Sequence, residues 1–203
     1  MVEHAQPLLE QDVDADPLRQ FERWFAEAGG VSRAPEATAL ATASSDGAPS
    51  VRMVLLKRFD ETGFVFHTNY ESRKGRELGA NPRAALVLYW DALGRQVRIE
   101  GRVERTSREE TDDYFRSRPR GAQIGARVSR QSEPIASREE LESRIAAETE
   151  ARDGEDVPLP EWWGGYRVLP EVYEFWQHRD DRLHDRFRYR RDGERWLVER
   201  LQP

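Results

Sequence analysis

Charged and apolar residues alternate from Arg182 to Arg190, close to the C-terminal end of the chain. Because successive side chains of an extended strand point to opposite faces, this pattern predicts a strand with one strongly basic face. The basic face carries Arg182, His184, Arg186, Arg188 and Arg190, and the other face carries Leu183, Phe187 and Tyr189. Two interpretations stay open. The strand is either the solvated face of an antiparallel hairpin or a site for a planar anionic ligand, since arginine offers a fork of donors and stays charged.

The composition of the 203 residues limits the function classes. A net charge of −6, with 38 acidic against 32 basic residues, argues against a dedicated nucleic-acid-binding protein, which usually has a global basic excess. The chain has no cysteine, which excludes disulfides, thiolate metal sites and a cysteine nucleophile. No apolar stretch approaches the ~18 residues of a membrane span, and the acidic start lacks an apolar signal core. We therefore expect a cytoplasmic protein that neither spans a membrane nor binds nucleic acid.

Periodic segments predict a mainly β chain of the α+β class. Residues 1–16 are expected to form a flexible arm, and residues 17–203 a single domain that begins with a helix capped by Asp16. Strands are expected over 37–43, 50–57, 63–68, 84–90, 96–105, 171–177, 183–190 and 195–201. Three further helices are expected after the capping residues Ser72, Ser107 and Ser137. This order of elements favours an antiparallel barrel or sandwich with inserted helices.

Two cations stand in the first turn of the helix expected after Ser72. Arg73 and Lys74 oppose the helix dipole at this end, at a cost of about 0.3–1 kcal/mol each. The arrangement is favourable when an anion, most simply a phosphate, occupies the helix N-terminus. The alternative is a surface charge that salt screens.

Two further pairs of residues indicate anion binding. Arg52 and Lys57 flank an apolar run on one strand, and their odd spacing permits one anion on each side of that strand; strand-end side chains that reach solvent are the alternative. Tyr114 and Arg118 lie four residues apart on the helix that begins after Ser107, so they share a face and could grip one phosphate. A basic helix end is also favourable by itself.

No metal site is expected, because the four histidines lack the spacing of metal ligands. These are His4, His67, His178 and His184. The sequence also lacks a phosphate-binding P-loop, a dinucleotide glycine fingerprint and a serine nucleophile elbow. An enzyme with this sequence therefore needs a bound organic cofactor to perform its chemistry.

Eight segments together resemble the pyridoxine/pyridoxamine 5′-phosphate oxidase family of flavin enzymes. They are 52–57, 68–74, 95–97, 114–120, 131–132, 163–165, 174–177 and 182–186, and the resemblance runs from about residue 16 to the C-terminus. It implies an FMN-binding split β-barrel with peripheral helices, and a homodimer with FMN at the subunit interface. It also implies oxidation of pyridoxamine or pyridoxine 5′-phosphate to pyridoxal 5′-phosphate, with O₂ as acceptor and release of H₂O₂.

The resemblance also assigns roles to individual residues. FMN would be bound by Arg52, Met53, Val54, Leu55, Leu56, Lys57, His67, Thr68, Arg73, Lys74, Gln96, Gln131, Ser132, Trp176 and Arg186. The substrate would be bound by Lys57, Tyr114, Arg118, Arg182, Leu183 and His184. Arg182 and His184 are the expected catalytic residues at the pyridine ring, where Arg182 positions the substrate and His184 hydrogen-bonds the ring hydroxyl or assists proton loss. Arg186 is the cation expected beside the reduced flavin, which gains negative charge.

Some positions depart from the pattern of the family. Ala122 stands where a serine usually donates to the substrate phosphate, and His67 replaces a usual tyrosine. Other segments are similar to a sister branch, the flavin oxidases of phenazine biosynthesis, which act on tricyclic aromatic acids. Because Lys57, Tyr114 and Arg118 are all present, we favour the vitamin B6 phosphate as substrate. A phenazine-type oxidase and a non-catalytic flavin-binding split-barrel protein are the alternatives.

Overall fold

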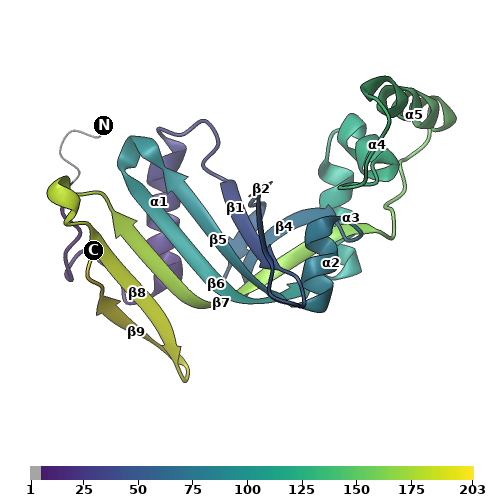
Figure 1. The fold of residues 1–203 in the computed structure, drawn as a ribbon. Coiled ribbons are helices and arrows are strands. Elements are labelled where there is room, and N and C mark those ends of the chain that lie inside the picture. The colour runs from purple at the N-terminus through teal and green to yellow at the C-terminus, as the bar shows by residue number, and fades with distance from the viewer. Residues whose placement is uncertain (1–5) are drawn as a thin grey trace.

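The computed structural model describes residues 6–203, and these residues form one antiparallel sheet with helices around it. The strands are β1 (Ala37–Ala43), β2 (Pro49–Leu55), β3 (Arg58–Asp60), β4 (Gly63–Asn69), β5 (Arg83–Trp90), β6 (Arg95–Arg105), β7 (Trp163–Gln177), β8 (Asp185–Asp192) and β9 (Arg195–Arg200). Their order is β2-β1-β5-β6-β7-β4-β3, and β8 pairs with both β7 and β9. The sheet curls into an open half-barrel (Figure 1), which confirms the mainly β, α+β split-barrel prediction.

The long strand β7 connects the two ends of the molecule. Its first half pairs with β4, its second half pairs with β8, and β6 runs along it with one register shift between Glu100 and Gly101. At the shift only a glycine fits, because a Cβ on Gly101 would lie 1.9 Å from the carbonyl oxygen of Leu169. The bulge bends the sheet.

A helix fills the curl of the sheet. α1 (Pro17–Gly29) starts where the Asp16 side chain accepts the Leu18 N–H at 2.9 Å, as predicted. It buries Phe21 and Trp24 completely against aromatic residues of the strands. Each such side chain contributes about 1.5–3 kcal/mol through its burial, so this contact holds α1 in place.

The remaining helices gather at the end of the sheet away from β8 and β9 (Figure 1). They are α2 (Arg73–Ala80), α3 (Arg108–Ser117), α4 (Arg120–Val128) and α5 (Arg138–Ala151), with short 3-10 helices η1 (Asp91–Leu93) and η2 (Asp180–Arg182) elsewhere. A second apolar cluster of Phe115, Ile124, Val157 and Trp163 anchors α3 and α4 to the start of β7. Ser72, Ser107 and Ser137 cap α2, α3 and α5, which confirms those three predictions.

Among the element boundaries that differ from the sequence-based expectation, two bear directly on predicted site residues. The helix after Ser107 ends at Ser117 instead of continuing through Arg118, because a residue that precedes proline disfavours the helical region and Pro119 follows. The basic strand begins at Asp185 instead of residue 183, since Asp181 and Arg182 adopt the left-handed region with φ of 54° and 63°. Arg182 therefore ends η2 and His184 lies in the loop after it, so neither belongs to the strand that carries Arg186.

The expected flexible arm lies partly outside the described residues, as does His4. Its described part, residues 6–16, contacts the β8–β9 hairpin. The Leu8 N–H donates to Asp185 at 3.1 Å, Arg200 donates to the Leu8 carbonyl at 3.0 Å, and the Tyr189 hydroxyl donates to the Asp14 carbonyl at 2.7 Å. No helix within residues 6–203 is long and apolar enough to cross a membrane. The cytoplasmic location stays a prediction.

Candidate active site

The first group of predicted site residues meets at the N-terminus of α2. The Lys74 ammonium donates to the side-chain oxygens of Gln131 at 2.6 Å and Thr68 at 3.1 Å. The backbone N–H of Arg73 donates to the Ser132 hydroxyl at 3.2 Å. Ser132 has a φ of 77°, so the loop after α4 is held in a left-handed conformation that brings its side chain to the helix start. Five residues predicted from two distant segments, 68–74 and 131–132, thus form one cluster.

A buried carboxylate organises the arginines of this cluster. Glu77 accepts from Ser50 at 2.6 Å, from Arg52 at 3.1 Å and from the Nε of Arg73 at 2.8 Å, and it also accepts from Thr42. Burial alone would raise the pKa of Glu77, but these hydrogen bonds and cations lower it to about 2. Glu77 therefore stays ionised and fixes Arg52 and Arg73 on either side of it. No sequence pattern singles out Glu77, because a glutamate in a charged helix usually faces solvent.

Lys74 is buried beside neutral oxygens and another cation. Burial and, to a smaller degree, the charge of Arg52 together lower the pKa of Lys74 to about 8, while Glu77 opposes the change. A buried ammonium of this kind calls for an anion. The N-terminus of α2 lies at the same place, so the cluster fits a phosphate group.

The second group lies around the first residues of β7. The rings of His67 and Tyr114 stack with centroids 4.0 Å apart, and the rings of His67 and Trp163 stack at 5.3 Å. The Arg118 guanidinium lies 4.6 Å from the centre of the Trp163 ring. We expected Tyr114 and Arg118 to share one helical face, but α3 ends at Ser117 and Arg118 is extended. Both side chains still lie at this aromatic cluster.

Several polar atoms of this second group have no partner. Both ring nitrogens of His67 and the Nη1 of Arg118 are buried without a hydrogen bond to any residue that the structure describes. Burial, together with the charges of Arg118 and Lys57, lowers the pKa of His67 to about 4. The group therefore combines a neutral imidazole with two cations and a tyrosine hydroxyl.

The third group lies at the far end of β7. A cavity of about 560 Å³ is lined there by Trp176, His178, Arg179, Asp180, Asp181, Arg182 and His184. The backbone N–H of Arg179 donates to the Nδ1 of His184 at 3.1 Å, and the rings of His184 and Trp176 lie 4.6 Å apart. Burial and the charges of His178, Arg182 and Arg186 lower the pKa of His184. A neutral His184 that accepts at Nδ1 carries its proton on Nε2.

Another buried carboxylate positions Arg186 in this group. Glu174 on β7 accepts from the Nε of Arg186 at 2.9 Å and from Arg98 at 2.7 Å. Gln96 lies opposite Trp176 in the β6–β7 register. Leu183 is exposed on the same loop, at 67%.

One chain does not bring the three groups together. Gly165, opposite His67, and Trp176 are eleven residues apart on β7, which corresponds to about 36 Å of extended strand. Figure 1 shows α2 to α5 at one end of the sheet and the β8–β9 hairpin at the other. The first two groups therefore lie far from Arg182, His184 and Arg186 within one copy.

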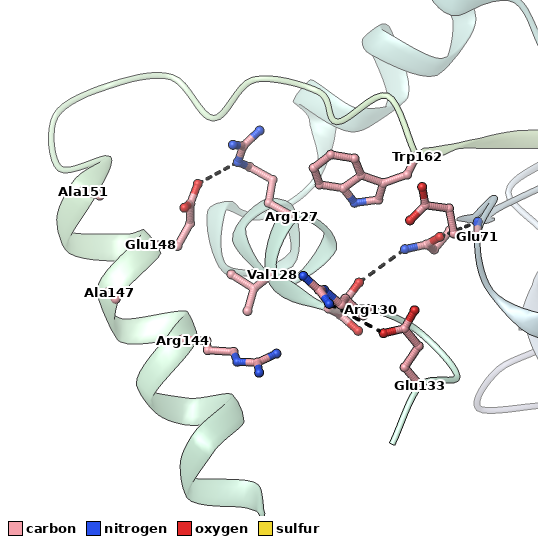
Figure 2. A pocket seen from close by; sticks show the side chains of 12 residues that line it. Glu71, Arg127, Val128, Arg130, Glu133, Arg144, Ala147, Glu148, Ala151 and Trp162 are labelled. Atoms are coloured by element: carbon pink, nitrogen blue, oxygen red, sulfur yellow. Dashed lines mark hydrogen bonds and ion pairs between the residues drawn. The ribbon is translucent and has the colours of Figure 1, made fainter. Parts of the chain in front are cut away.

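A cavity that the sequence did not indicate lies beside the first group (Figure 2). It measures about 890 Å³ and lies between α4, α5 and the segment before α2. Arg127, Arg130 and Arg144 line it, with Arg127 paired to Glu148 at 2.7 Å. Its lining comes from separate parts of the chain, so no contiguous sequence pattern could reveal it.

Comparison with known proteins decides the family. Residues 26–150 match the family model described as Pyridoxamine 5′-phosphate oxidase, and residues 163–203 match the Pyridoxine 5′-phosphate oxidase C-terminal dimerisation region. The chain belongs to the pyridoxamine 5′-phosphate oxidase family. This confirms the resemblance and shows that the protein is an enzyme of the oxidase type.

Individual relatives of this oxidase cover nearly the whole chain. It is 59% identical to a pyridoxine/pyridoxamine 5′-phosphate oxidase of Rubrobacter xylanophilus over 97% of this chain and 91% of that one. It is 57% identical to the protein of the same name from Thermosynechococcus vestitus, over 98% and 94%. The structure of PhzG from Burkholderia lata in complex with tetrahydrophenazine-1-carboxylic acid superimposes with a TM-score of 0.91 at 36% identity, covering 98% of this chain and 99% of that one.

FMN is the cofactor of this oxidase family, which confirms the cofactor prediction. The first group fits the phosphate of FMN, since it offers a buried ammonium, two arginines oriented by Glu77 and the N-terminus of α2. Of the predicted strand residues, Leu56 is buried while Met53 and Leu55 are exposed on β2. The individual binding roles of all these residues stay predictions.

Proposed function

We propose that the protein oxidises pyridoxamine 5′-phosphate or pyridoxine 5′-phosphate to pyridoxal 5′-phosphate, with O₂ as the final acceptor. The amine substrate, O₂ and water give the aldehyde, ammonia and H₂O₂, and the alcohol substrate and O₂ give the aldehyde and H₂O₂. Bound FMN supplies the redox chemistry by accepting two electrons from the substrate carbon and passing them to O₂. The observation that carries the proposal is the second group, in which the charges of Arg118 and Lys57 act on the buried His67, and the ring nitrogens of His67 and the Nη1 of Arg118 have no hydrogen-bond partner among the described residues.

The residues of the chain divide the remaining work. Lys57, Tyr114 and Arg118 bind the substrate phosphate, which fixes the substrate at the end away from the reacting carbon. Arg182 covers the pyridine ring and excludes water. His184 donates from Nε2 to the ring hydroxyl, because its Nδ1 already accepts from the backbone of Arg179.

The active site draws on two copies of the chain in a homodimer with FMN at the interface. The substrate phosphate group and the ring group lie at opposite ends of β7, so a complete site needs Arg182, His184 and Arg186 from a partner subunit. Residues 163–203 match a dimerisation region. An exposed apolar stripe on β2, formed by Val51 at 70% and Met53 at 62%, offers a surface that a second copy would cover.

A phenazine-type oxidase is the second candidate, favoured by the 0.91 TM-score with PhzG. The two candidates differ in the anion that the substrate carries, because the B6 substrates carry a phosphate and the ligand of PhzG carries a carboxylic acid. Lys57 and Arg118 supply two positive charges, which match a phosphate dianion better than a carboxylate.

One assay separates the candidates. The FMN-loaded protein is mixed with pyridoxamine 5′-phosphate, pyridoxine 5′-phosphate or a dihydrophenazine carboxylic acid, and H₂O₂ release is measured. We expect turnover with the two B6 phosphates. Turnover with the phenazine precursor alone would refute the proposal, and a loaded protein that turns over none of the three would favour a non-catalytic flavin-binding role.

A further inference from the structure

His67 is the residue whose environment the proposed roles leave unexplained. Its ring is buried against the rings of Tyr114 and Trp163, yet neither ring nitrogen has a hydrogen-bond partner among the residues that the structure describes. Leaving a buried donor unsatisfied costs about 1–3 kcal/mol. A phenylalanine would keep the stacking without that cost, so the nitrogens point to a ligand.

The neighbours of His67 define the kind of ligand. Arg118 lies against the same Trp163 ring, and its Nη1 is also buried without a partner. The charge of Lys57 acts on His67 as well. A group that accepts hydrogen bonds from an imidazole, a guanidinium and an ammonium together is an anion with several oxygens, as in a phosphate monoester.

The charge state of His67 suits a neutral hydrogen-bond donor to the anion and not a cation that would neutralise it. Its lowered pKa leaves the ring neutral at pH 7, with one N–H donor available. Two cations already face the site, and a third would raise the cost of burying positive charge when the site is empty. Position 122, at the first turn of α4, carries only a methyl group, so the chain offers no hydroxyl donor there.

We propose that His67 donates a hydrogen bond to the substrate phosphate and thereby sets the preference for phosphorylated over unphosphorylated substrate. This inference rests on the proposed function and assigns His67 to the substrate rather than to FMN. In this role His67 determines substrate specificity through the phosphate and does not contact the reacting carbon. A serine at position 122 is expected to supply an equivalent donor.

The test compares His67→Phe, which keeps the ring stacking, with His67→Gln, which keeps a donor. For His67→Phe we expect the KM for pyridoxamine 5′-phosphate to rise roughly 10- to 100-fold, with a smaller effect on kcat. The KM for unphosphorylated pyridoxamine should not rise in parallel. His67→Gln should lie between the wild type and His67→Phe, and adding Ala122→Ser to His67→Phe should recover at least part of the loss.

A binding measurement keeps the inference testable without turnover. The FMN-loaded wild type and both His67 variants are titrated with pyridoxal 5′-phosphate and with inorganic phosphate, and the dissociation constant of FMN is measured by flavin fluorescence. We expect weaker binding of both phosphates to His67→Phe and an unchanged FMN constant. Weaker FMN binding with unchanged phosphate binding would overturn the assignment. If the wild type turned over no B6 phosphate, the proposed function would fail, while the titrations would still decide the role of His67.

Discussion

Lys74 should destabilise the protein that lacks FMN while it strengthens FMN binding. The fall of its pKa from 10.5 to about 8 corresponds to roughly 3 kcal/mol of unfavourable burial of the charged form. Replacement of Lys74 by methionine removes this cost and keeps the buried stem. We therefore expect Lys74→Met to raise the free energy of unfolding of the FMN-free protein by up to about 3 kcal/mol at pH 7, and to weaken FMN binding roughly 10- to 100-fold.

The pH dependence of the wild type follows from the same pKa. Below pH 8 the lysine is protonated in the folded and unfolded protein, and the full cost is present. Between pH 8 and 10.5 the unfolded chain binds more protons, so the free energy of unfolding of the FMN-free protein rises with pH. FMN affinity falls over the same range, because its phosphate then has to bind to a neutral amine.

Urea denaturation of the FMN-free protein at pH 7 and 9.5, and FMN titration by fluorescence quenching between pH 7 and 9.5, measure both effects. Lys57 is the only other lysine of the chain, and it is exposed, so Lys57→Met is a matched control that should change the free energy of unfolding by less than about 0.5 kcal/mol. A Lys74→Met protein that is less stable than the wild type at pH 7, with FMN affinity still falling above pH 8, would refute the reasoning.

Three further predictions address the other parts of the site. Glu77→Gln should lower the free energy of unfolding by about 2 kcal/mol at pH 7. The difference from the wild type should shrink as the pH falls from 4.5 to 2, because the wild-type carboxylate gains its proton over this range. Urea denaturation at several pH values in this range measures the difference. Arg118→Ala should raise the KM for pyridoxamine 5′-phosphate roughly 10- to 100-fold with FMN affinity retained, and equal losses of both would contradict its assignment to the substrate. The double variant Val51→Asp with Met53→Asp should sediment as a monomer without oxidase activity, whereas an intact dimer would exclude the β2 stripe from the interface.

Local sequence patterns predicted the elements well where local forces decide them. Ser72, Ser107 and Ser137 each accept a hydrogen bond from a backbone N–H three residues on, and this interaction needs no tertiary context. Alternating strands around the core were also found. The segment 163–170 was missed, because Gly164 and Gly165 interrupt its pattern; they are required there since a Cβ would collide with Tyr70 and Thr106.

The site was predicted as a list of residues and not as an arrangement. The motifs named side chains that the structure brings together at the N-terminus of α2, but the separation of Tyr114 and Arg118 from Arg182 and His184 depends on the length of β7. The alternation of charged and apolar residues did not reveal that the backbone at Arg182 is left-handed, so the strand was predicted to begin too early. The positioning roles of Glu77 and Glu174 arise only once the sheet brings distant arginines to them.

Counting charges at the two anion sites explains why their side chains differ. At the α2 site, Arg52, Arg73 and Lys74 carry three positive charges, and Glu77 removes one, which leaves two. At the aromatic site, Lys57 and Arg118 also carry two, and the remaining donors are neutral because burial keeps the imidazole of His67 uncharged. A phosphate monoester carries about −1.5 to −2 at pH 7. The charge of each proposed phosphate site therefore matches one such group: at the first a carboxylate cancels an excess cation, and at the second a neutral histidine stands where a third cation would be in excess.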